Sequence, residues 1–264
     1  MLTTSARGIS ARSVAADAQH TAAWVALLPL TFVICGLDSA YIAARWPYGQ
    51  WAADAVMIGF YVWMAHQGPP RLRALMRYGV VIGLVGESLC SLVFGMYEYR
   101  LHNIPLYVPL GHPVIYGAIY HFVREPFVVR HRRALTSAMF VASVGYSLWW
   151  LVAAHDVFGA VCALVFVWIV LADAESRTFF LAMYLLVAFL EQVGTGFGAW
   201  TWYEYAFGGV KLLPSGNPPS GISIFYFAFD GLCLLAYLKR RPLLRARYRR
   251  LRTRLQETPE LAQA

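Results

Sequence analysis

Eight apolar runs divide the 264-residue chain, and they constrain its fold more than any other feature. An α-helix rises about 1.5 Å per residue, so about 20 apolar residues cross the roughly 30 Å hydrocarbon core of a bilayer. Each run is long enough, or nearly long enough, to form such a helix. We therefore expect an all-α integral membrane protein with eight transmembrane helices. The runs cover residues 22–44, 48–66, 78–98, 106–123, 135–154, 157–173, 178–203 and 220–238.

The composition excludes two other classes of protein. Hydrophobic residues make up 59% of the chain and charged residues only 14%, whereas soluble domains are about 45–50% apolar and about 25% charged. A soluble enzyme of this length could not bury so much apolar surface. Aromatic residues make up 16% of the chain, which excludes intrinsic disorder.

Basic residues predict the orientation of the chain. The net charge is +8, and nine basic residues lie between Lys239 and Arg254. With eight spans and a cytoplasmic N-terminus, 19 of the 22 Lys and Arg lie on the inner side, and only Arg45, Arg100 and Lys211 lie outside. This asymmetry is typical of a plasma-membrane (inner-membrane) protein with both termini in the cytoplasm. We expect the basic tail to bind anionic lipid headgroups, and we expect no nucleic-acid partner.

The two halves of the chain resemble each other. Glu87 and Glu191 are 104 residues apart, the Tyr-Glu-Tyr triplet at 97–99 recurs at 203–205, and Gly-His-Pro at 111–113 recurs as Gly-Asn-Pro at 216–218. Ordered matches at a nearly constant offset indicate an internal duplication. Because four spans separate the copies, equivalent helices run in the same direction, as two parallel four-helix repeats about a pseudo-two-fold axis along the membrane normal. The expected divisions are an N-terminal tail at 1–21, repeats at 22–130 and 131–238, and a basic tail at 239–264.

Two acids lie deep in the predicted bilayer. Glu87 is roughly 14 Å and Glu191 roughly 19 Å from the inner surface by helical rise, and the duplication places them across the pseudo-axis from each other. Such a pair can act as general acid and general base. The alternative is a protonated pair that joins the two halves as interhelical glue.

Small residues follow both acids at helical spacing. We expect each acid to share a helix face with the residues that follow it, which leaves room for a neighbouring helix or for a ligand. The two expected faces are Glu87, Ser91, Gly95 and Glu98, and Glu191, Thr195, Gly198 and Trp202.

His112 and Asn217 occupy equivalent places, each followed by a proline. Both motifs are typical of a helix start, with Asn or His at the cap and Pro in the first turn. His112 is alternatively a catalytic proton relay, and Asn217 a substrate contact.

Aromatic and further acidic residues complete the predicted site. The acids Asp38 and Asp230 are either proton carriers or hydrogen-bonded structural groups, and the aromatics form either a ligand pocket or an interfacial belt. Residues 104–110 contain two prolines and predict an interfacial segment rather than a regular helix. The histidine spacing matches no standard metal site, and we expect no metal or cofactor. The predicted substrate contacts are Tyr97, Tyr99, Trp200, Trp202, Tyr203, Tyr205, Asn217, Asp38 and Asp230.

The second-half motif resembles a known family. The string Glu191–Gly198 (EQVGTGFG), followed by Tyr203 and Tyr205, is similar to the membrane-integral carotenoid 1,2-hydratase family, and residues 104–110 resemble its Val-Pro-Leu stretch. In this chain the pieces are divided between the two halves. The resemblance implies addition of water to a long polyene or isoprenoid, or proton-driven rearrangement of it.

The residues and the resemblance together predict a membrane enzyme that performs acid–base chemistry on a lipophilic, isoprenoid-like substrate. Glu87 and Glu191 are its expected acid and base. The alternatives are a proton-coupled transporter, which uses the same features, and a structural or assembly subunit in which the carboxyls only join helices.

Overall fold

The computed structural model describes the backbone of residues 11–239 and the side chains of residues 23–239. This part is mostly helical, with eight helices of at least seven residues. The long helices are α1 (Ala11–Leu37), α3 (Gly49–Gln67), α4 (Pro70–Glu87), α5 (Tyr107–Phe122), α7 (Arg132–Ala154), α8 (Val157–Ala172), α9 (Arg177–Gly196) and α11 (Ser223–Lys239). The short elements are α2 (Ala40–Ala43), the π-helical turn η1 (Ser88–Val93), β1 (Tyr97–Tyr99), α6 (Pro126–Arg130), β2 (Trp200–Trp202) and α10 (Ala206–Gly209).

Each predicted apolar run overlaps one long helix, although some boundaries differ, and α4 begins eight residues before its run. Helix α9 ends at Gly196 rather than at residue 203, because the chain turns at Gly198 (φ 68°) and enters β2. The expectation of an interfacial segment at 104–110 is wrong for its second half, since α5 begins at Tyr107. Pro109 lies in the first turn of α5, where a backbone N–H has no helical acceptor to lose. The basic tail lies almost wholly in residues 240–264, outside the described residues.

Three segments are long and apolar enough to cross a membrane. The first joins α4 and η1 over Pro70–Val93, the second is Arg132–Ala154 and the third is Arg177–Gly196, with 24, 23 and 20 residues. Two further apolar helices, Ala23–Leu37 and Val157–Ala172, are shorter. The described part of the chain therefore contains at least three helices that a bilayer can accommodate.

Buried Asp156 fixes the loop before α11. It caps α8 by accepting the Gly159 N–H at 3.0 Å, as Asp does at helix starts. The same carboxylate accepts the backbone N–H groups of Gly216 at 2.8 Å and Ser220 at 2.7 Å. Three donors hold this carboxylate, so the segment between β2 and α11 is tied to the start of α8.

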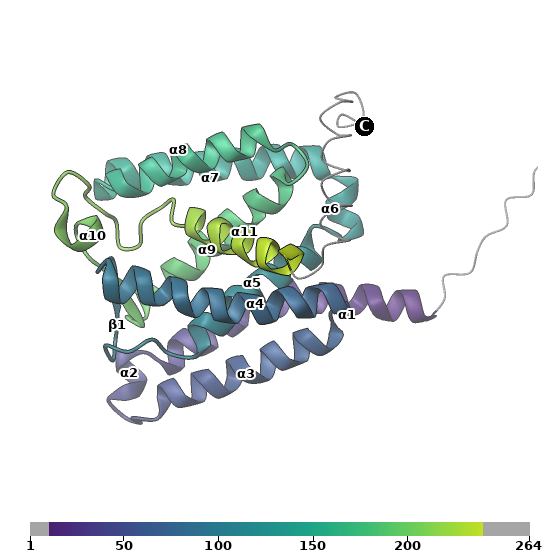
Figure 1. The fold of residues 1–264 in the computed structure, drawn as a ribbon, viewed down its shortest axis with the longest axis horizontal. Coiled ribbons are helices and arrows are strands. Elements are labelled where there is room, and N and C mark those ends of the chain that lie inside the picture. Colours follow the sequence, from purple (N-terminus) through teal and green to yellow (C-terminus); the bar gives the residue numbers. More distant parts are fainter. Residues whose placement is uncertain (1–10, 240–264) are drawn as a thin grey trace, which may run out of the picture.

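The long helices run side by side, and the short elements lie at the ends of the bundle. Helices α1, α3, α4 and α5 contact one another, and α7 contacts α8 and α9. Helix α9 also packs on α1, α5 and α11, so it joins the two groups. Strand β1 and helices α2 and α10 lie at one end, at the left of Figure 1, and α6 lies at the opposite end.

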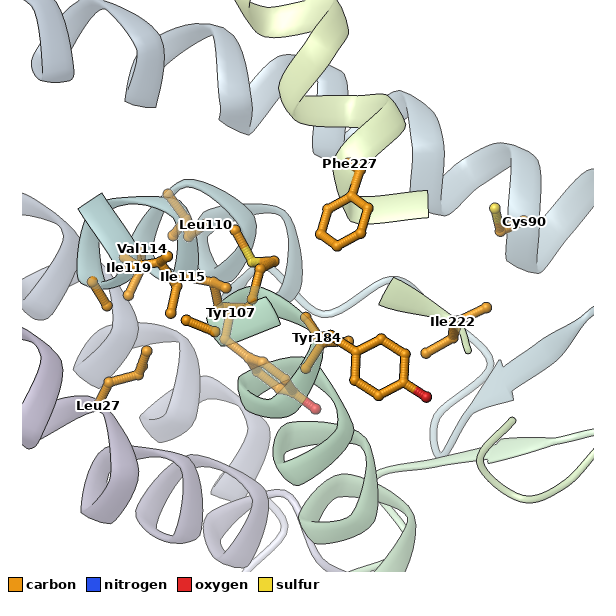
Figure 2. Close-up of a cluster of buried hydrophobic side chains, with 14 of the residues drawn as sticks. Leu27, Cys90, Tyr107, Leu110, Val114, Ile115, Ile119, Tyr184, Ile222 and Phe227 are labelled. Atoms are coloured by element: carbon orange, nitrogen blue, oxygen red, sulfur yellow. The ribbon is translucent and has the colours of Figure 1, made fainter. Parts of the chain in front are cut away.

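Apolar side chains fill the interior and cover the outer face. Buried residues of α1, α5, α9 and α11, among them Leu27, Ile115, Tyr184 and Phe227, belong to one core (Figure 2). On the outside, α7 and α8 expose large apolar side chains, of which Val152 is 77% exposed. An apolar exterior of this extent fits lipid rather than water.

Candidate functional site

Glu87 ends α4 as a buried acid surrounded by donors. The hydroxyls of Tyr97 and Tyr99 both donate to its Oε2. His112 Nε2 lies 2.7 Å from its Oε1. Because an ionised carboxylate only accepts hydrogen bonds, the two hydroxyl donors favour the ionised form of Glu87. In that form, His112 adds a third hydrogen bond when its proton is on Nε2. The π-helical turn η1 directly follows Glu87, a distortion that recurs at functional sites.

Glu191 of α9 is equally buried but differently paired. The indole N–H groups of Trp200 and Trp202 donate to its Oε2 at 2.8 and 3.0 Å. An indole N–H can only donate, so Oε2 is the acceptor in both hydrogen bonds. No described residue forms a hydrogen bond with Oε1 of Glu191, which leaves this oxygen to hold a proton or to meet a ligand.

A two-stranded ribbon presents these aromatic donors. Strands β1 and β2 are antiparallel, with Tyr97 opposite Trp202 and Tyr99 opposite Trp200. Alternate side chains of a strand point to the same face, so all four rings face the two acids. Gly95 (φ 55°) and Gly198 (φ 68°) turn the chain from the preceding helices into the strands, a conformation that side chains disfavour.

The two acids line one cavity. Its walls include the ribbon aromatics Tyr97, Tyr99, Trp200 and Trp202, the α11 residues Phe225, Tyr226 and Phe229, and Ile222 just before α11. Each acid is only 6% exposed. The structure therefore combines two carboxyl groups with aromatic walls in one cavity.

His112 lies inside α5, six residues after Leu106. The interpretation of His112 as a helix cap is therefore wrong, since the helix starts five residues earlier, at Tyr107. Gly83 of α4 makes room for the imidazole, because a Cβ there would lie 3.0 Å from His112 Cδ2. The ring also packs on Tyr226, with centroids 4.6 Å apart.

Asn217 does not start a helix either, since α11 begins at Ser223. Instead, its Oδ1 accepts the backbone N–H of Trp202 at 3.0 Å. Asn217 therefore holds β2 in place through this hydrogen bond, and it does not line the cavity that the acids share.

Asp38 is a buried structural acid. It follows α1 and pairs with Arg100 at 2.5 Å, and it accepts hydrogen bonds from Gln50 at 3.3 Å and from the Tyr107 hydroxyl at 2.8 Å. The sequence allowed either a proton carrier or a hydrogen-bonded structural group, and these contacts match the second interpretation.

Asp230 of α11 lies outside the shared cavity. It lines a separate, smaller cavity with Pro113 and Tyr116 of α5. Its buried Oδ2 has no hydrogen-bond partner among the described residues.

Tyr203 and Tyr205 also lie outside the shared cavity. Tyr203 is exposed and donates to Glu98 at 2.9 Å, and this hydrogen bond raises the pKa of its hydroxyl. Tyr205 forms a β-bridge with Pro214. In the ribbon, the residues opposite Tyr97 and Tyr99 are Trp202 and Trp200, and these two bond Glu191.

The two predicted helix faces are wrong beyond their first turn. Gly95 and Glu98 lie beyond the end of η1, and Gly198 and Trp202 lie beyond the end of α9. The rings reach the acids because the chain turns back from each helix, not because it continues as a helix.

Sequence reasoning missed the α11 wall of the cavity. Ile222, Phe225, Tyr226 and Phe229 have the three- and four-residue spacing of one helix face, which was the available signal. A uniformly apolar run hides such a face, since lipid-facing and cavity-facing residues have the same chemistry.

No group of three or more His, Cys, Asp and Glu side chains that could hold a metal ion occurs among residues 23–239. Comparisons with protein-family models, with curated proteins and with solved structures found no match.

Proposed function

We propose that this protein is a multi-pass membrane enzyme that protonates a double bond of a lipophilic, isoprenoid-like substrate. The observation that carries the proposal is the shared aromatic cavity with two buried carboxyl groups in unlike hydrogen-bond environments. Unlike environments are what separates an acid from a base in one site.

The proposed membrane arrangement has eight spans in two parallel repeats. The eight long helices, the basic residues on one side and the positions of β1 and β2 support it. Each repeat would supply a helix that ends near an acid, a glycine turn and a strand with two aromatic donors. Both termini would be cytoplasmic in the inner membrane, with the basic tail on anionic lipid headgroups.

Glu191 is the proposed acid. Its Oε1, free of hydrogen bonds from the described residues, would carry the proton, while the two indoles hold Oε2 in place. Protonation forms a C–H bond, breaks the O–H bond of Glu191 and leaves a carbocation on the substrate.

Glu87 and His112 form the proposed base. Water that attacks the cation loses a proton to this pair, and the net reaction is hydration. If the pair instead removes a proton from a neighbouring carbon, the product is a rearranged or cyclised isomer. In both cases one proton leaves Glu191 and one arrives at Glu87 and His112, so proton transfer across the cavity restores the starting state.

The aromatic walls would stabilise the cation. A positive charge over the face of Trp or Tyr gains roughly 0.5–2 kcal/mol, most when water is excluded. Tyr97, Trp200, Trp202 and Tyr226 line the space between the acids. The resemblance of residues 191–205 to carotenoid 1,2-hydratases supports the same class of chemistry.

Purified Glu87→Gln and Glu191→Gln proteins test the proposal, with lycopene and squalene as linear polyene and isoprenoid probes. General acid–base catalysis contributes about 10²–10⁴-fold, so each variant should form product at least about 100-fold more slowly than wild type. Glu98→Gln is the matched control, because Glu98 lies on the other face of the ribbon and is 44% exposed at its side chain. Full activity in both variants would refute the catalytic roles. Loss of proton-linked uptake would indicate a transporter, and a changed melting temperature alone would indicate a structural pair.

A further inference from the structure

A second cavity adjoins the shared cavity and has a different chemistry. Its walls come from α1, α3, α5 and α9, with Trp200 of β2 and Tyr226 of α11. We call this second cavity the apolar groove. Neither Glu87 nor Glu191 lines it.

Three polar side chains that line the apolar groove donate their hydrogen bonds within the protein. The Thr31 hydroxyl donates to the carbonyl of Leu27 at 2.8 Å, and the Tyr107 hydroxyl donates to Asp38 at 2.8 Å. The Trp200 N–H donates to Glu191. An occupant would therefore be held by packing against apolar surface, which favours a hydrocarbon without hydrogen-bonding groups.

The apolar groove is elongated along two helices. It follows α1 from Leu27 to Cys35 and α5 from Tyr107 to Ile115. Each stretch has nine residues, and its eight steps of 1.5 Å correspond to roughly 12 Å of helix axis. Figure 2 shows Leu27, Tyr107 and Ile115 in the region between these helices. This shape fits a linear chain.

The apolar groove and the shared cavity have a common wall. Val108, Trp200 and Tyr226 line both of them. His112 lines the apolar groove with its ring and contacts Glu87 through Nε2. One ligand could thus reach from the groove to the two acids.

We propose that the apolar groove holds the linear hydrocarbon chain of the substrate while one double bond lies between Glu87 and Glu191. This inference rests on the proposed function, and it adds that the acids act on a substrate held by its unreactive chain. A phospholipid fits less well, because its phosphate would have to approach the two carboxyl groups. The occupant is therefore an uncharged chain.

Gly111 of α5 offers a way to fill the apolar groove. A Cβ at Gly111 would lie 3.7 Å from Met57 Cε, an ordinary contact, so a larger side chain extends into the groove from a tolerated position. Gly59→Leu is the matched control, since Gly59 is exposed on α3 and a Cβ there meets nothing within 4 Å. Thr31→Phe fills the groove from the opposite wall, on α1. It is the second test variant if Gly111→Leu does not fold.

The test is photo-crosslinking of the full chain in nanodiscs with a farnesyl hydrocarbon that carries a diazirine. Adducts should map to residues 27–35 and 107–115. A side chain that fills the groove excludes the probe, so Gly111→Leu or Thr31→Phe should lower labelling at least about tenfold, which corresponds to about 1.4 kcal/mol of binding free energy. Gly59→Leu should not lower it. Squalene should compete with the probe, and dioleoyl phosphatidylcholine should not.

Labelling only on the lipid-facing surface, or equal competition by phosphatidylcholine, would overturn the inference. Glu191→Gln separates the two proposals, because it should keep the labelling while losing turnover. Normal labelling together with full turnover in Glu191→Gln would leave the groove intact and remove the proposed function. If the groove is not labelled but Glu191→Gln still loses turnover, the proposed function stands and the groove inference fails.

Discussion

Tyr97 and Trp202 stand opposite each other in the ribbon, with ring centroids 4.4 Å apart, yet they donate to different acids. The Tyr97 hydroxyl bonds Glu87, and the Trp202 indole bonds Glu191. A single cross-strand pair thus contacts both carboxyl groups. Any change that displaces one strand should therefore affect both acids.

Gly83→Ala should impair the contact between His112 and Glu87. The new Cβ would lie 3.0 Å from His112 Cδ2 and 3.3 Å from the carbonyl of Pro109, so the imidazole or α5 must shift. We expect turnover to fall by at least about tenfold, because misplacement of a proton relay by a fraction of an ångström is costly. Gly145→Ala, where a Cβ meets nothing within 4 Å, should keep full turnover. Equal rates for the two variants would show that this contact is dispensable.

Gly194→Ala should displace the Trp200 indole from Glu191. The added Cβ would lie 1.9 Å from Trp200 Cη2, so the ring cannot stay where it is. The change should appear in the near-ultraviolet circular dichroism of the tryptophans and in a lower melting temperature. Gly196→Ala lies in the same last turn of α9, has nothing within 4 Å and should leave the spectrum unchanged. An unchanged spectrum for Gly194→Ala would contradict the placement of Trp200.

Asp38→Asn should destabilise the fold without touching the acids. Removing one partner of a buried ion pair costs about 3–5 kcal/mol, and Asp38 is fully buried beside Arg100. We expect a clear fall in melting temperature in detergent. The exposed pair of Glu98 with His102 is the comparison, and Glu98→Gln should cost less than about 1 kcal/mol. Similar melting temperatures for wild type and Asp38→Asn would show that the pair is not structural.

The proposed eight spans predict the side of each loop. Reporter fusions after Pro70, Arg130 and Pro242 should read cytoplasmic, because the basic residues flank these positions. A fusion near Gly209 should read external. An external signal after Pro242 would contradict both the number of spans and the parallel arrangement of the repeats.

The sequence alone was enough to locate the helices and the two acids. It was not enough to predict which side chains form hydrogen bonds with the acids. Apolar runs locate helices because a bilayer leaves the backbone few other ways to satisfy its hydrogen bonds. Glu87 and Glu191 stand out because ionisable groups are rare in such runs. The ribbon could not be found in this way, since three-residue strands have no periodicity to detect. The matching Tyr-Glu-Tyr triplets made Tyr203 and Tyr205 the expected equivalents of Tyr97 and Tyr99, whereas the residues that bond Glu191 are Trp200 and Trp202, which the sequence also named as contacts.

The role of His112 shows a second limit of sequence. Pro113 indicated a helix start, but the helix begins earlier and continues through the proline. Its packing against Gly79, where a Cβ would lie 2.9 Å from Pro113 Cβ, depends on α4, which is distant in sequence. Contacts between helices decide whether a proline starts a helix or lies inside one, and the order of residues in the sequence does not reveal these contacts.

The most direct test of the central claim is the mass of the product formed from lycopene or squalene in D₂O. If Glu191 protonates a double bond, each turnover should leave one deuterium bound to carbon, because the carboxyl proton exchanges with solvent before it is transferred. Glu191→Gln should form no such product, whereas Glu98→Gln should form it at the wild-type rate. A product without carbon-bound deuterium, or equal incorporation by Glu191→Gln, would contradict the account.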